Sequence, residues 1–95
     1  MKPVTSFEVI SHGIDYPDYF QGCGVCCTEF DSVATGVGGT EAEAFDDALE
    51  GLSQQDWDTE TVETDAIKQY GKPSRKPIPK KYGDEAYFYI SILVR

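Results

Sequence analysis

Histidine is almost absent from this sequence, and hydrophobic runs of membrane-spanning length are missing. The longest apolar run, residues 87–94, is far shorter than the roughly 20 residues that a membrane-spanning helix needs. The opening Met-Lys-Pro does not begin the apolar stretch of a secretory signal. These absences predict a cytoplasmic protein that does not engage a membrane.

The sequence also lacks the residue patterns of common catalytic sites. His12 is the single histidine, and no Gly-x-Ser-x-Gly, P-loop or His-Glu-x-x-His pattern is present. Carboxylates are plentiful, but no nucleophile, base and orienting group stand together in the sequence. We therefore expect a binding protein rather than an enzyme, and no cofactor.

Three cysteines, Cys23, Cys26 and Cys27, fall within five residues. Neighbours this close on an extended segment cannot all pair, so a disulfide framework is disfavoured. The Cys-x-x-Cys spacing matches half of a zinc site, with Cys27 and His12 as further ligands, and a redox role is a third interpretation. No second ligand pair follows, so we favour free cysteines that pack as small hydrophobic residues and expect no metal.

The formal net charge of −9 is divided unevenly along the chain. Residues 1–67 contain 15 acidic residues and one basic residue, whereas residues 68–83 contain six basic residues and none that is acidic. Phosphate binding needs clustered Lys and Arg, so we expect no direct contact with nucleic acid. The acidic body suits a basic groove on a partner protein, or it is a solvated face that maintains solubility.

Three β-rich segments occupy the first part of the chain. Residues 4–12 alternate and predict a first strand that Gly13 ends. Residues 22–29 and 32–38 flank a short polar turn, so we expect them to form an antiparallel hairpin. Glycines alternate in both strands of this hairpin, which is typical of a bulge, a bend, or the close approach of another backbone or a ligand.

One helix is predicted directly by its cap. Thr40-Glu41-Ala42-Glu43 is a capping box, and an apolar stripe follows at Phe45, Ala48, Leu49 and Leu52. The helix should end within residues 53–56. Its outer face is acidic and carries Glu43, Asp46, Asp47 and Glu50.

The remaining segments are a weak element, a loop and a strand. Residues 57–64 predict a short edge strand, and residues 65–70 one turn of helix. Residues 71–83 contain three prolines within seven residues and predict an exposed, basic, extended loop. Residues 86–95 alternate strongly, so we expect a central strand that pairs with the first strand.

Together these elements predict an α+β fold with the order β-β-β-α-(β)-β. We expect a single domain, residues 1–95, in which an antiparallel sheet of about four strands carries one main helix on one face. The hairpin followed by a Thr-capped helix resembles the architecture of HicB-type antitoxins, which are similar to small ribonuclease-H-like domains.

The residues themselves resemble small, acidic, uncharacterised proteins of bacteriophages and mobile elements. The resemblance lies in four segments: Tyr19-Phe20-Gln21-Gly22-Cys23-Gly24-Val25, residues 28–38, Asp46-Asp47-Ala48-Leu49-Glu50-Gly51-Leu52, and Tyr87-Phe88-Tyr89-Ile90-Ser91-Ile92. Small acidic phage proteins often resemble inhibitors of host defence, including anti-CRISPR proteins. The resemblance therefore implies a protein that acts in the cytoplasm of a host cell.

Three binding functions follow as hypotheses. The first is an anti-CRISPR-type inhibitor, a monomer or homodimer, that binds a basic surface of a host protein. Its predicted contact residues are Glu43, Asp46, Asp47, Glu50, Tyr16 and Tyr19. The second is a sponge for a nucleotide or other small ligand, with predicted contacts at Gly36, Gly38, Lys72, Arg75 and Lys76. The third is a structural or regulatory phage module with a protein partner.

Overall fold

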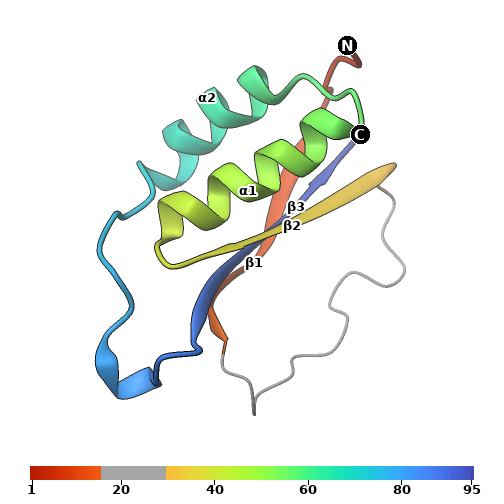
Figure 1. The fold of residues 1–95 in the computed structure, drawn as a ribbon. Helices are drawn as coiled ribbons and strands as arrows, with labels where there is room; N and C mark the ends of the chain where they lie inside the picture. Colours follow the sequence, from red (N-terminus) through yellow and green to blue (C-terminus); the bar gives the residue numbers. More distant parts are fainter. Residues whose placement is uncertain (16–29) are drawn as a thin grey trace.

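A computed structural model of the 95-residue chain describes residues 1–15 and 30–95. The described elements are three strands, two α-helices and one short 3-10 helix (Figure 1). In chain order they are β1 (Phe7–Asp15), β2 (Ser32–Gly38), α1 (Glu41–Gln54), α2 (Thr59–Tyr70), η1 (Lys80–Tyr82) and β3 (Tyr87–Val94). The predicted strand at 22–29 and its hairpin lie outside the described residues.

The three described strands form an antiparallel sheet in the order β1-β3-β2. The last strand is therefore central, and it pairs with the first strand from Phe7 opposite Val94 to Asp15 opposite Tyr87. Both features confirm the sequence prediction. The end predicted for the first strand was wrong, because Gly13 stays in the ladder opposite Tyr89 and the strand continues beyond it.

Both helices cover the same face of the sheet, which makes a two-layer α+β fold (Figure 1). The core between the layers takes Ile90, Ile92 and Val94 from β3, and the last two are fully buried. The predicted apolar stripe of α1 packs against them. Alternation along β3 therefore placed these side chains on the helical face as predicted.

Helix α1 begins at its predicted cap. The Thr40 hydroxyl accepts a hydrogen bond from the Glu43 N–H at 3.1 Å, and the Glu43 carboxylate accepts one from the Gly39 N–H at 2.9 Å. The first bond satisfies a backbone donor that the first turn of a helix leaves without a partner, and the second ties the residue before the cap to the helix. The helix ends at Gln54, within the predicted range.

Helix α2 corrects the weak element of the sequence analysis. Residues 59–70 form one continuous helix, so the predicted edge strand at 57–64 was wrong, and the helix predicted at 65–70 was right in type but too short. Asp58 caps this helix by accepting hydrogen bonds from the Thr61 N–H at 3.4 Å and the Thr61 hydroxyl at 2.8 Å. Val62 and Ala66, four residues apart, are its buried positions. The threonines and valine of this segment favour a strand, but the Asp58 cap and the four-residue spacing of the two buried positions favour a helix.

Helix α1 lies directly on two glycines of β2. A Cβ atom at Gly36 would come closer than 3.0 Å to the backbone of Ala44 and Ala48, and one at Gly38 would come closer than 3.0 Å to Glu43. Of the alternatives that the glycine pattern left open, the close approach of another backbone therefore applies at both positions. The absent side chains allow strand and helix to meet at backbone distance.

The basic loop, residues 71–83, is largely without regular structure, as expected, but its start is tied to α1. The Ser74 N–H donates to the Glu41 carboxylate at 3.1 Å, and the Ser74 carbonyl accepts from the Ala42 N–H at 3.0 Å. The loop also contains the short helix η1. Hydrogen bonds to the start of α1 therefore fix the position of the first residues of the loop.

We predict that Gly36→Ala will destabilise the fold by roughly 2–3 kcal/mol, because the new methyl group overlaps helix backbone that cannot rotate away. Urea unfolding followed by circular dichroism measures this change. Gly39→Ala is the matched control, because its Cβ would meet only the end of the Glu43 side chain, at 3.4 Å. Equal stability of the two variants would contradict the close packing of α1 on β2.

Candidate binding site

The first candidate surface is the acidic α1 face, formed by Glu43, Asp46, Asp47 and Glu50. All four residues are exposed on the side of α1 that faces away from its buried stripe. The structure thus brings together the four acidic residues that the sequence predicted as contacts. The other two predicted contacts, Tyr16 and Tyr19, lie outside the described residues.

No lysine or arginine among the described residues lies within ion-pair distance of these four carboxylates. Within the described part of the chain, the one ion pair joins the Met1 amino group to the Asp56 carboxylate, at 3.6 Å. Asp47 instead accepts a hydrogen bond from the Val37 N–H at 3.0 Å, which links α1 to β2. Residues 41–67 contain ten acidic residues and no basic one, so the negative charge extends into α2.

The residues predicted for a small-ligand site are not brought together. Gly36 and Gly38 lie beneath α1, with its backbone against them. Lys72 is at the end of α2, and Arg75 and Lys76 are exposed farther along the basic loop. Of the predicted residues, Lys72 lines the pocket described next, whereas the two glycines, Arg75 and Lys76 do not.

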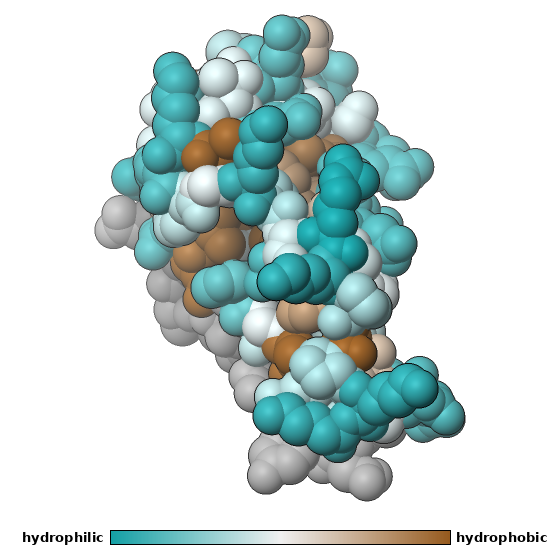
Figure 2. All heavy atoms as spheres, turned by 90° about the vertical axis from the view of Figure 1, so that its left-hand side faces the viewer, coloured by the Kyte–Doolittle hydropathy of each residue, from teal (hydrophilic) through white to brown (hydrophobic). Residues whose placement is uncertain are grey.

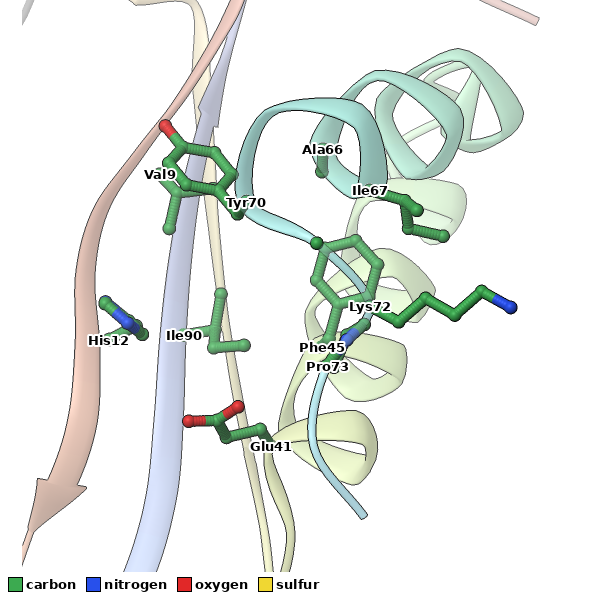
Figure 3. A pocket seen from close by; sticks show the side chains of 11 residues that line it. Val9, His12, Glu41, Phe45, Ala66, Ile67, Tyr70, Lys72, Pro73 and Ile90 are labelled. Carbon is green, nitrogen blue, oxygen red and sulfur yellow. The ribbon is translucent and has the colours of Figure 1, made fainter.

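A pocket of about 190 Å³ lies where β1, the start of α1 and the end of α2 meet (Figure 3). Figure 2 shows the side of the molecule on which α1 begins and α2 ends. Hydrophobic residues are visible there between projecting hydrophilic side chains. Its lining is mostly apolar, and four of its side chains are polar or ionisable: His12, Glu41, Tyr70 and Lys72. The other lining residues are Val9, Phe45, Ala66, Ile67, Gly71, Pro73 and Ile90.

The charged side chains of the pocket point in different directions. In Figure 3 the Glu41 carboxylate extends toward the sheet, near Ile90, and the His12 ring approaches the same region from β1. The Lys72 amino group extends away from the other labelled side chains, so it contributes its aliphatic stem rather than its charge. The interior of the pocket is therefore apolar with a carboxylate at its wall.

The sequence analysis missed this pocket. Its walls come from four parts of the chain, residues 9–12, 41–45 and 66–73 and Ile90 of β3, that only the folded chain brings together. One wall is the end of α2, which the sequence did not predict as a full helix. The sequence did contain a signal for α2. Asp58 is a suitable N-cap, and Val62 and Ala66 follow it four residues apart, as on the buried side of a helix.

Comparisons with protein-family models, curated proteins and solved structures returned no match to this chain. Within the described residues, no helix has the length and apolar character needed to cross a membrane. The same residues contain no group of three or more His, Cys, Asp or Glu side chains arranged to hold a metal ion. The three cysteines lie outside the described residues.

The opposite face of the sheet carries a tyrosine–carboxylate pair. The Tyr87 hydroxyl donates a hydrogen bond to the Asp15 carboxylate at 3.1 Å, across paired residues of β3 and β1. This hydrogen bond, with a smaller contribution from the Asp15 charge, raises the pKa of Tyr87 above its ordinary value. The bond favours neutral tyrosine, so its contribution to stability is present at neutral pH and is lost as the pH rises through the raised pKa.

We predict that Asp15→Asn will lower the pKa of Tyr87 toward its ordinary value, because the carboxylate charge that disfavours tyrosinate is removed. A pH titration followed by NMR of isotope-labelled tyrosine measures the Tyr87 pKa directly. Asp84→Asn, an exposed residue close in sequence to Tyr87, is the control and should leave that pKa unchanged. An unchanged Tyr87 pKa in Asp15→Asn would show that the charge of the Asp15 carboxylate does not raise it.

Proposed function

We propose that this chain is a non-catalytic binding protein that docks its acidic α1 face on a basic surface of a partner protein. The observation that carries the proposal is the set of four exposed carboxylates without a basic partner among the described residues. Self-repulsion among such charges disfavours the isolated fold, whereas a basic partner relieves it.

The electrostatics of the chain favour rapid association with such a partner. Opposite charges attract over about 8 Å at physiological ionic strength, so a surface of one sign steers a basic partner before contact. Because the four carboxylates lie on one capped helix, their spacing is fixed, and the helix can present them together to a basic groove of the partner. Nucleic acid is disfavoured as the partner, because its phosphates would face carboxylates.

The setting that we propose is the cytoplasm of a bacterial host, where the protein inhibits a defence system in the manner of an anti-CRISPR protein. The support is the resemblance of its segments to small acidic phage proteins, together with the acidic α1 face. Both a monomer and a homodimer are compatible with this proposal. A structural or regulatory phage module would use the same face on a phage partner.

The small-ligand sponge has less support. Its predicted glycines pack against α1, and the pocket at Lys72 is smaller than the roughly 300–1,000 Å³ of typical ligand sites. We therefore favour a protein partner.

The test compares two variants with equal net charge. The face variant combines Glu43→Gln, Asp46→Asn and Glu50→Gln and keeps Asp47, which bonds β2. The control combines Asp31→Asn, Asp84→Asn and Glu85→Gln, three exposed sites outside the helices. Each variant changes the net charge by three, from −9 to −6.

The native protein is used first to capture its partner from a bacterial lysate, and binding of the purified partner is then measured for each variant. We expect the face variant to associate about tenfold more slowly and to lose most of its salt dependence. The control should retain more of the native rate. If the two variants bind equally well, the acidic α1 face is not the docking surface.

A further inference from the structure

The pocket between β1, α1 and α2 has the chemistry of a receptor for one cationic side chain. We propose that it accepts an arginine of the basic partner, with the aliphatic stem against the apolar walls and the guanidinium on the Glu41 carboxylate. This inference rests on the proposed function, because it supplies the anchor for a partner that the acidic α1 face attracts. The pocket residues themselves were not among the contacts predicted for that function.

The charge of the pocket favours a cation. Glu41 Oε2 accepts the Ser74 N–H at 3.1 Å, and a carboxylate with about four acceptor positions keeps most of them after one such bond. The C-terminal end of α2, which carries partial negative charge, lines the pocket through Tyr70 and Gly71. The partial positive charge at the start of α1 is about half a unit and is outweighed by the full charge of Glu41.

The basic side chains at the pocket leave this charge largely in place. No ion pair joins Glu41 to Lys72 or any other basic group of the described residues. The Lys72 amino group extends away from the pocket, as Figure 3 shows. His12 faces the same region as Glu41 and offers a further hydrogen-bonding group.

The size and lining select one side chain rather than a larger ligand. An apolar cavity of about 150 Å³ holds a benzene molecule, so a pocket of about 190 Å³ suits one long side chain. Phe45, Val9 and Ile90 provide walls for methylene groups. An arginine fits better than a lysine, because guanidinium is weakly hydrated, stacks on aromatic rings such as Tyr70, and binds a carboxylate with two N–H groups.

The pocket and the acidic α1 face meet at the start of α1. Glu41 and Glu43 belong to the first turn of this helix but lie on opposite sides of it, so the partner that we propose extends around the start of α1 to contact both. Interface energy is typically concentrated in a few buried anchors, of which arginine is among the commonest. The face would then attract the partner and the pocket would fix its position.

The direct test uses n-propylguanidinium, which has the head and stem of an arginine side chain, as a probe of the native protein by two-dimensional NMR. We expect saturable shifts of the amide signals of Glu41, Phe45 and Ile90. Propylurea, the uncharged analogue, and butyrate, an anion of similar length, should give no saturable shift there. Absence of saturation with propylguanidinium, or equal binding of propylurea or butyrate, would overturn the inference.

Two variants assign the probe to the pocket. Glu41→Gln should weaken binding roughly tenfold, because it removes the charged acceptor while its amide oxygen still accepts the Ser74 N–H. His12→Lys, at an exposed position of β1, should also weaken it by placing a second cation opposite Glu41. The matched controls are Glu63→Gln and Thr64→Lys on the exposed side of α2, with the same charge changes. Probe affinity that falls equally in controls and pocket variants would exclude a specific site.

The same variants separate this inference from the proposed function. Glu41→Gln leaves the acidic α1 face intact, and the face variant leaves the pocket intact. If the probe does not bind while the face variant loses its partner, the anchor is wrong and the docking face stands. If the probe binds in the pocket while the face variant keeps its partner, the docking face is wrong and the pocket stands as a separate cation site.

Discussion

The close contact between α1 and β2 is the constraint on which the rest of the structure depends. Gly36 and Gly38 allow the helix backbone to lie against the strand, and Asp47 adds a hydrogen bond to the Val37 N–H. This contact fixes which side of α1 faces solvent. The acidic α1 face and the entrance of the pocket both follow from it, because the start of the same helix carries Glu41.

Charge is separated from the core with unusual completeness in the helical layer. The buried positions of α1 and α2 are apolar, whereas ten carboxylates and no basic residue occur over residues 41–67. Hydrophobic burial therefore holds the helices on the sheet, and the exposed charges contribute little to that packing. Within the acidic α1 face, Asp47 bonds β2 and Glu43 bonds the Gly39 N–H, whereas Asp46 and Glu50 are free to serve in recognition alone.

Much of the fold was predictable because its signals are local. The strand at 32–38 and the capping box at Thr40 depend on the period of a few neighbouring residues, and both are confirmed. Only residues 65–70 of helix α2 were predicted as helical, because threonine-rich alternation concealed the Asp58 cap. The acidic α1 face was predictable from helical spacing alone, whereas the pocket joins four distant segments and had no sequence signal of its own.

The sequence by itself determined the charge of this protein, the start of its main helix and the central place of its last strand, since each depends on composition or short-range periodicity. Tertiary structure alone decided what the glycines of β2 do and where Glu41 points. Both outcomes depend on which helix lies over which strand, and that arrangement is set by packing between residues far apart in the chain.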